Sequence, residues 1–453
     1  MTGAIRRRWS RGLRRGALTL AFCFVATGAQ ADATLDAVVC DKGAFPAIIG
    51  ADHALLHLGR DLFYDPILSG NRTVACATCH HPKFGTSDGL ALSIGDGGIG
   101  MGPGRRVDPE NLPERRIPRN AQALFNLGYP EFRVMFHDGR VERLDNGTIR
   151  TPFGPVPDTG PLAMLKVQAI LPVISPDEMA GHYSENDVSA AVRRGLFQGP
   201  DGAYAILAKR VADIPEYRRR FRTWAGAPWT PSFDDIALAL AAFMAHEWRA
   251  DDSPFDRFLC NGTPLSVQAE AGRRLFYGQA GCSECHSGRF QTDHRFHAIA
   301  IPQIGPGKTE RFETHARDIG RQRVTGRIDD AYRFRTPSLR NVALTAPYGH
   351  SGVYADLETV IRHHLDPARG LAAFQSSSVR LPDLPGADDF RIATDHKELA
   401  AISAANVLPA RPLSREEVQL LISFLHALTD PISAAGRLGV PETVPSGLPV
   451  PRP

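Results

Sequence analysis

Apolar residues recur at helical spacing in several separate stretches of this chain. In the clearest stretch, 233–248, Ile236, Leu240, Phe243 and Met244 form one stripe. Steps of three and four residues place side chains on the same face of an α-helix, so each such stretch predicts a helix with one buried face. The same spacing predicts further helices over residues 51–64, 164–170, 187–194, 204–211, 266–277, 357–365 and 415–428. The pattern therefore predicts a mainly α-helical protein.

Long stretches without periodicity separate these helices. Residues 81–119 are rich in glycine and proline, residues 145–163 contain repeated Pro and Gly breaks, and residues 287–335 show little periodicity. Glycine and proline favour turns and interrupt regular structure. We therefore expect long loops, with residues 145–163 forming an inserted surface loop. The glycine cluster at 95–100 lacks the Lys-Ser/Thr ending of a phosphate-binding loop, which excludes that kind of site.

Two of the predicted helices are followed by the same short motif, in which His comes directly after Cys-x-x-Cys. The two copies are Cys76-Ala-Thr-Cys79-His80 and Cys282-Ser-Glu-Cys285-His286. In this motif the thiols form thioether bonds to a haem and the imidazole coordinates its iron. A zinc site or a redox-active disulfide is the alternative for any Cys-x-x-Cys pair, but no further cysteine is near enough in the sequence to complete a four-thiolate site. The chain is therefore expected to bind two haem c groups, with His80 and His286 as iron ligands.

The repeated motif divides the chain into two haem-binding units. We expect an N-terminal cytochrome c-like domain over residues 32–250 and a C-terminal one over residues 265–432, joined by a link at 251–264. A Pro-rich tail, residues 433–453, follows. The predicted fold class is mainly α, with two cytochrome c-like haem domains that face each other.

The first 31 residues have the character of a secretory signal. Six arginines precede an apolar run at 17–26, and Ala29-Gln30-Ala31 supplies the small residues of a cleavage site. The apolar run is too short to span a membrane comfortably. We expect cleavage after Ala31, export to the periplasm and no membrane span in the mature protein.

Charge and cysteine usage look different once this segment is removed. Residues 1–31 carry six arginines and no acidic residue, so their removal changes the formal net charge from +3 to −3. This balance gives no basis for nucleic-acid binding. Of the seven cysteines, one leaves with the signal and four belong to the haem motifs. The remaining two, Cys40 and Cys260, are predicted to pair in an oxidising compartment; the alternative is two buried free thiols.

The residues around both motifs carry a family resemblance. They include the stretch from Leu58 to Pro66, the Phe-x-Asp-Gly-Arg stretch at 136–140 and the phrase from Phe334 to Tyr348. These segments resemble the bacterial dihaem cytochrome c peroxidase superfamily, which includes the methylamine-dehydrogenase-maturation enzyme MauG. The resemblance covers most of the mature chain. It implies that the first haem reacts with hydrogen peroxide and that the second transfers electrons.

The same resemblance implies two catalytic side chains above the first haem. Family members place a Gln there and a Glu ten residues later, and Gln168 and Glu178 match both residue types and the spacing. A distal carboxyl group can move a proton between the two peroxide oxygens, and the amide can hold the peroxide by a hydrogen bond. The alternative for Glu178 is a solvated residue at a helix start.

A loop position near the first haem departs from the family pattern. Relatives can carry a His after a Ser-Ile-Gly-like run that occupies the distal face of this haem, whereas this chain has Asp96 after Ser93-Ile94-Gly95. A carboxylate is a poorer ligand than imidazole for low-spin haem iron, so the first haem is expected to be open. A plain turn residue is the alternative for Asp96.

At the second haem, the resemblance implies a sixth ligand fourteen residues after the His of the Pro-Tyr-x-His turn. That His is His350, so the expected ligand is His364, which together with His286 gives a bis-histidine iron. His363 is the rival, because adjacent helical residues point about 100° apart and only one can reach the iron.

His137 takes the place of a Trp that relatives have between the haems. Because imidazole is harder to oxidise than indole, His137 is less suited than Trp to relay electrons between the haems. The alternative role for His137 is to anchor a haem propionate.

Family members also hold a calcium ion between the haems, through an Asn side chain and two backbone carbonyls. Asn120, Thr345 and Pro347 match these positions. Oxygen donors suit calcium, so the resemblance implies a calcium site here.

Together these features predict a periplasmic dihaem oxidoreductase. As a peroxidase, the protein would reduce hydrogen peroxide to water with electrons from a small periplasmic donor protein. As a MauG-like enzyme, it would use peroxide to oxidise aromatic residues of a partner protein. A dihaem electron carrier is a third class, but it leaves Gln168 and Glu178 without a role. The resemblance is also compatible with a homodimer.

Overall fold

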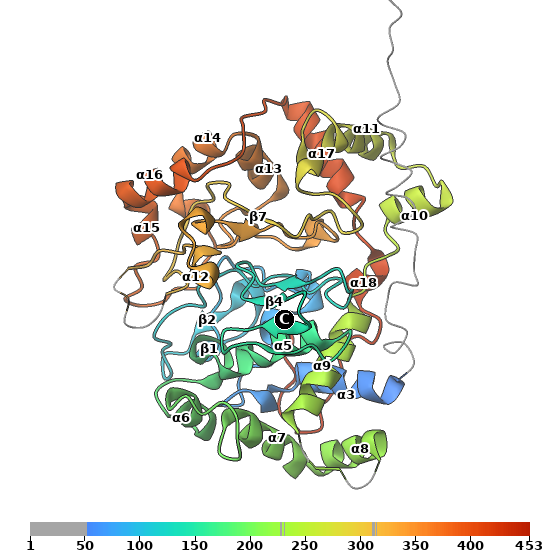
Figure 1. Ribbon diagram of the computed structural model, residues 1–453, viewed down its shortest axis with the longest axis vertical. Coiled ribbons are helices and arrows are strands. Elements are labelled where there is room, and N and C mark those ends of the chain that lie inside the picture. Colours follow the sequence, from blue (N-terminus) through green and yellow to red (C-terminus); the bar gives the residue numbers. More distant parts are fainter. Residues whose placement is uncertain (1–51, 227–228, 231, 310–312, 314) are drawn as a thin grey trace, which may run out of the picture.

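Helices dominate the structure, a computed structural model that describes residues 52–226, 229–230, 232–309, 313 and 315–453 (Figure 1). The helices of the N-terminal half are α3 (His53–Tyr64), α4 (Cys76–Cys79), α5 (Ala163–Ile170), α6 (Asp187–Arg193), α7 (Ala203–Asp213), α8 (Pro215–Ala225) and α9 (Phe233–Glu247). Those that follow are α10 (Pro254–Asn261), α11 (Val267–Tyr277), α12 (Gln322–Thr325), α13 (Leu357–Leu365), α14 (Pro367–Ala372), α15 (Arg391–Thr394), α16 (His396–Ala404), α17 (Arg415–His426) and α18 (Pro431–Ala435). The prediction of a mainly α-helical protein is confirmed.

Some predictions fall on other parts of the chain. The predicted signal segment, residues 1–31, and Cys40 lie outside the described residues. Cys260 is disulfide-bonded, and its pairing with Cys40 stays a prediction. Within the described ranges, no helix combines the length and the apolar composition that a bilayer crossing requires.

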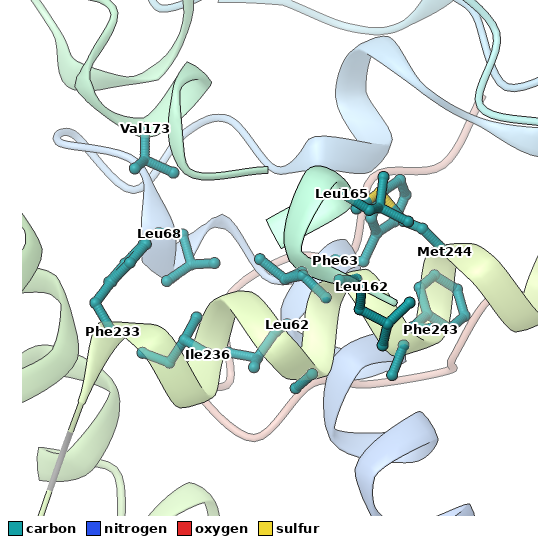
Figure 2. Packing of buried hydrophobic residues seen from close by; sticks show 14 of the residues in the cluster. Leu62, Phe63, Leu68, Leu162, Leu165, Val173, Phe233, Ile236, Phe243 and Met244 are labelled. Atoms are coloured by element: carbon teal, nitrogen blue, oxygen red, sulfur yellow. The ribbon is translucent and has the colours of Figure 1, made fainter. Parts of the chain in front are cut away.

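The first helix pair, α3 and α9, forms the core of the N-terminal half. Figure 2 shows Leu62 and Phe63 of α3 beside Phe243 of α9, and all three are at most 1% exposed. The helices approach closely at Gly59, where an added Cβ would clash with the carbonyl oxygen of Ala239. Close packing of this kind excludes water and fixes the end of α3 beside the first haem motif.

The second helix pair, α11 and α17, repeats this design. Ser266 caps α11 by accepting a hydrogen bond from the Ala269 N–H at 3.2 Å. An added Cβ at Gly272 would clash with the carbonyl oxygen of Leu420 on α17. Gly272 and Gly59 hold the same place in the phrase Gly-Arg-x-Leu-Phe-Tyr. Each Cys-x-x-Cys-His motif therefore follows a helix that packs on a distant helix through a glycine.

The strands are short and lie in the loops. They are β1 (Gly98–Ile99), β2 (Arg106–Val107), β3 (Val134–Met135), β4 (Val141–Arg143), β5 (Thr148–Arg150), β6 (Val156–Pro157), β7 (Phe296–His297) and β8 (Phe334–Arg335). Strands β3 to β6 form an antiparallel sheet in sequence order. The segment 145–163 therefore differs from the expected loop: it carries two strands of this sheet, and Ile149 and Val141 are fully buried.

Buried ion pairs join the two halves of the molecule. Arg119 lies 2.6 Å from Asp138 and 2.6 Å from Asp318, and none of the three is more than 5% exposed. Arg321 of the C-terminal half pairs with Glu142 of β4 at 2.6 Å. Because loss of one partner leaves the other charge buried and unpaired, such contacts hold the two halves in a defined arrangement.

The C-terminal tail returns to the N-terminal half. The Glu247 carboxylate at the end of α9 accepts hydrogen bonds from the N–H groups of Leu438 and Gly439 at 2.7 and 2.9 Å. Ser446 donates to Asp65 at 2.7 Å. Figure 1 shows the marked C-terminus over the N-terminal half. Within residues 433–453, the predicted Pro-rich tail, Leu438, Gly439 and Ser446 thus contact the unit that begins the chain, and the domain boundaries stay a prediction.

Candidate active site

The first haem motif opens onto a cavity with an empty volume of about 1110 Å³, partly open to solvent. Cys76, Cys79 and His80 line it together with apolar residues of α3 and α9. The His80 Nδ1 lies 2.9 Å from the carbonyl oxygen of Thr86, which orients the ring and leaves Nε2 to bind a metal. Burial lowers the pKa of His80, which favours the neutral imidazole, the form that coordinates iron. The cavity and these donors fit a haem c.

Gln168 and Glu178 line this same cavity. Gln168 comes from α5 and is 7% exposed, and its buried Oε1 has no hydrogen-bond partner among the described residues. Glu178 comes from a single π-helical turn, Pro176–Ala180. A buried acceptor without a partner is costly unless a ligand or water satisfies it. The structure thus brings both predicted residues into the cavity of the first haem motif, with one free acceptor aimed at a small polar ligand.

Three cationic side chains, Arg119, Arg140 and Lys308, also line the cavity. Burial raises the pKa of Glu178, while the charges of Lys308 and Arg140 lower it; Asp177 adds a weaker effect that raises it. Burial lowers the pKa of Lys308, and Glu178 raises it. The proton affinity of the Glu178 carboxyl group is therefore set by burial on one side and by two cations on the other.

Lys308 was missed by sequence reasoning because it belongs to the C-terminal half. Its loop is held against the N-terminal half by Arg115, which donates to the Thr309 carbonyl oxygen at 3.1 Å and pairs with Asp177 at 2.9 Å. An added Cβ at Gly305 would clash with Leu92. A lone lysine between Gly307 and Thr309 carries no sequence signal for a site 130 residues away.

At the second motif, His364 of α13 faces His286. The two ring centres are 6.4 Å apart with an interplanar angle of 56°. Metal–nitrogen bonds of about 2 Å on both sides of one iron would place two axial imidazole centres about 6.3 Å apart. The Nδ1 atoms donate to the carbonyl oxygens of Gln291 at 3.0 Å and Val360 at 2.8 Å, which leaves both Nε2 atoms for a metal. Burial lowers the pKa of His286 to about 4, so this ring is neutral as well.

The rival ligand His363 points elsewhere. Its Nε2 donates to the carbonyl oxygen of Ile299 at 2.6 Å, and its ring lies 5.1 Å from that of Tyr354. The side chain is 1% exposed. Of the two adjacent histidines, His364 therefore has the geometry of an axial ligand to a haem attached at Cys282 and Cys285.

His137 connects the first cavity to a strand of the C-terminal half, and its place between the haems stays a prediction. It lines the first cavity, and its carbonyl oxygen accepts a hydrogen bond from the N–H of Arg335 in β8 at 2.7 Å. Its Nε2 lies 3.2 Å from the carbonyl oxygen of Asn120, and burial lowers its pKa to about 4, so the ring is a neutral donor. A direct backbone contact thus links the first cavity to β8, whose next residue, Thr336, bonds to Arg295 near the second motif.

Arg335 is a partly buried cation beside this contact. Burial lowers the pKa of Arg335 to about 10. Its guanidinium donates to the carbonyl oxygens of Phe136 at 3.2 Å and Thr336 at 3.2 Å, and no carboxylate of the described residues pairs with it. Removing a guanidinium from water is costly unless an anion is near, and the propionates of a haem would supply that charge. Arg335 therefore adds to the fit between these residues and two haems.

The predicted calcium ligands are occupied in part by other contacts. The Asn120 Nδ2 donates to the carbonyl oxygens of Leu90 at 2.8 Å and Ala91 at 3.3 Å. The Thr345 hydroxyl donates to the Val342 carbonyl oxygen at 3.1 Å. These bonds leave the carbonyl oxygens of Thr345 and Pro347 untested as ligands, and calcium binding stays a prediction.

Comparison with known proteins identifies the family of this chain. Residues 53–263 match the family described as di-haem cytochrome c peroxidase. The methylamine utilization protein MauG of Paracoccus denitrificans is 31% identical over 408 residues, which span 84% of this chain and 89% of that protein. The chain belongs to the dihaem cytochrome c peroxidase and MauG family. The recognised resemblance is confirmed, and the protein is an oxidoreductase enzyme of a dihaem family, rather than a plain electron carrier.

Both branches of the family are represented among its relatives. Cytochrome c551 peroxidase of Pseudomonas aeruginosa is 29% identical over 308 residues, which span 67% of this chain and 69% of that protein. A solved structure of a MauG-like protein associated with microbial copper homeostasis covers 85% of this chain and 91% of its own, with a TM-score of 0.57 and 25% identity. The family membership implies two haem c groups per chain.

Proposed function

We propose that this protein is a periplasmic dihaem peroxidase, which reduces hydrogen peroxide to water in the cavity of the first haem motif. The observation that carries the proposal is that Gln168 and Glu178 share this cavity with His80. When bound, the first haem supplies an iron to which peroxide binds and through which electrons reach it. Hydrogen peroxide takes up two electrons and two protons to give two waters. The side chains of this cavity must therefore place the peroxide and move protons.

Glu178 is proposed as the group that moves the proton. As a carboxylate, it takes the proton from one peroxide oxygen and delivers it to the other, which then leaves as water. Gln168 has a buried Oε1 without a partner, which can accept a hydrogen bond from the peroxide and orient it. The apolar lining contributed by α3 and α9 limits competing water.

Electrons are proposed to arrive through the second haem site. Its two facing imidazoles, His286 and His364, would hold the iron of a haem, and a haem with two imidazole ligands would supply electron transfer. The contact between His137 and Arg335 lies between the two sites. A small electron-donor protein that docks near Cys282 and Cys285 would supply the two electrons.

A MauG-like activity is the second candidate, because a MauG is 31% identical over 408 residues. The two candidates differ in where the electrons originate. In steady state, a peroxidase should consume peroxide with a reduced small c-type cytochrome, at a rate that rises with donor concentration. Absence of any donor-dependent turnover, together with peroxide-dependent oxidation of aromatic residues in a partner protein, would support the MauG-like function instead.

Lys308→Met should shift the pH dependence of the peroxide reaction. A base must be ionised, so the rate rises with pH through the pKa of Glu178. Burial raises the pKa of Glu178 and the Lys308 charge lowers it; removal of that charge therefore raises the pKa and moves the acid limb to higher pH. Stopped-flow rates between pH 4 and pH 8 measure this shift.

Lys166→Met is the matched control for this prediction. Lys166 lies on α5, two residues from Gln168, but its ammonium pairs with Asp234 at 2.6 Å and it does not line the cavity. Its acid limb should coincide with that of the unmodified protein. An unmoved limb in Lys308→Met would show that the lysine charge acts on another group than Glu178.

A further inference from the structure

Asp96, which stands where relatives can carry a loop His, is fully buried but does not line the cavity. Its carboxylate accepts hydrogen bonds from the Asn71 side-chain amide at 2.7 Å and the Thr73 hydroxyl at 2.8 Å. A longer contact of 3.5 Å comes from the amide of Asn111. Both carboxylate oxygens are therefore engaged, so Asp96 acts on its neighbours rather than on the cavity.

The π-helical turn that carries Glu178 is held by the same group of residues. The carbonyl oxygens at 178, 179 and 180 accept hydrogen bonds from the N–H of Asp96 at 2.9 Å, the N–H of Gly70 at 2.7 Å and the Asn186 side-chain amide at 3.1 Å. The Asn186 amide also donates to the Asn71 side-chain oxygen at 3.0 Å. Each of these three carbonyl oxygens thus accepts a hydrogen bond either from Asp96 or from a residue near it in this network.

The opposite side of this network reaches the haem-attachment helix. Asn71 and Thr73 precede Cys76 by five and three residues, so the Asp96 carboxylate fixes the segment that leads into α4. An added Cβ at Gly95 would clash with the carbonyl oxygens of Asp177 and Glu178, which shows how closely this loop packs on the turn. One buried carboxylate therefore ties the attachment segment to the turn that bears Glu178.

We propose that Asp96 is a positioning residue, which sets the place of Glu178 relative to the first haem by joining the Asn71–Thr73 segment to the turn at 176–180. This inference rests on the proposed role of Glu178. Proton transfer requires the carboxyl group within hydrogen-bond reach of the peroxide, and a displacement of about 1 Å can cost about 100-fold in rate. A charged, hydrogen-bonded group is well suited to hold such a position, because its bonds are stronger than neutral ones.

Asp96→Asn tests the proposal in two backgrounds. The substitution keeps the shape but replaces one acceptor oxygen by an NH2 donor, which opposes the donor of either Asn71 or Thr73. In the otherwise unmodified protein, the stopped-flow rate with hydrogen peroxide should fall about 10- to 100-fold. In a Glu178→Gln background, the same substitution should change the rate by no more than about twofold. Asp96 is proposed to act only by positioning the Glu178 carboxyl group, and that group is absent in this background. A general loss of structure would lower both rates by the same factor.

Exchange and control measurements complete the test. Hydrogen–deuterium exchange of peptides that cover 175–186 should be faster in Asp96→Asn and, to a smaller extent, in the milder Thr73→Val. Asp108→Asn is the matched control, since the Asp108 side chain only caps the Glu110 N–H at 3.0 Å in an exposed turn of the same loop; its rate and exchange should be unchanged.

The outcomes separate this inference from the proposed function. Equal falls in both backgrounds, or no fall together with unchanged exchange, overturn the positioning role of Asp96. An unaltered rate in Glu178→Gln alone contradicts the proposed function instead. In that case faster exchange at 175–186 in Asp96→Asn would still support the structural tie, and normal exchange would overturn it.

Discussion

Replacing Glu178 by Gln should slow the reaction of the oxidised protein with hydrogen peroxide by about 100- to 1000-fold. The amide is isosteric and keeps a hydrogen bond to the ligand, but it cannot take a proton from one peroxide oxygen and return it to the other. Burial raises the pKa of Glu178, so the unmodified rate should increase with pH above the ordinary range for a glutamic acid. Stopped-flow absorbance of the haem bands measures both effects, and the acid limb should be absent in the variant.

The matched control is Glu110→Gln, at an exposed position of the 95–111 loop away from the cavity. Its rate and pH profile should equal those of the unmodified protein. Haem content of both variants should also be unchanged, because neither side chain belongs to a Cys-x-x-Cys-His motif. A normal rate in Glu178→Gln would remove this residue from the mechanism and leave Gln168, Arg140 and Lys308 as polar side chains of the cavity.

The helices that form the core could be predicted from the sequence because they are amphipathic. The predicted stretches 233–248 and 266–277 correspond to α9 and α11 with differences of one residue. Helix α10 was missed because it falls in a stretch expected as a link, although Ser253 and Asp256 form a capping box at its start. Helix α8 was missed because only Tyr217 and Phe221 of its eleven residues are buried. Strands of two or three residues are too short to show alternation.

Some residues of the candidate site could be recognised from a short stretch of sequence, whereas others contribute only through contacts between segments that are distant in the sequence. Cys-x-x-Cys-His is a contiguous motif whose chemistry is readable without a fold. Gln168 and Glu178 came from family resemblance, since neither residue stands out by periodicity or composition. The contributions of Lys308 and Asp96 depend on loops that meet only in the folded chain. No local pattern carries information about such contacts.

His364→Ala should open the second haem to outside ligands. Without the imidazole that faces His286, the iron would lose one of its two histidine ligands. Its low-spin, bis-imidazole signal in electron paramagnetic resonance should then disappear. Cyanide should then bind to two haems per chain in place of one. Peroxide turnover with a protein donor should fall steeply, because the potential of the electron-entry haem changes with its axial ligand. The expected loss of the spectroscopic signal is complete rather than partial.

His363→Ala is the decisive counterpart, because the two histidines are adjacent and the sequence alone could not choose between them. His363 donates to the Ile299 carbonyl oxygen at 2.6 Å and is 1% exposed, so its removal should lower the free energy of unfolding by about 1–3 kcal/mol. The bis-imidazole signal and the cyanide stoichiometry should nevertheless be retained. If the signal instead survives in His364→Ala and is lost in His363→Ala, α13 must rotate when the haem is attached, and the ligand is the other histidine.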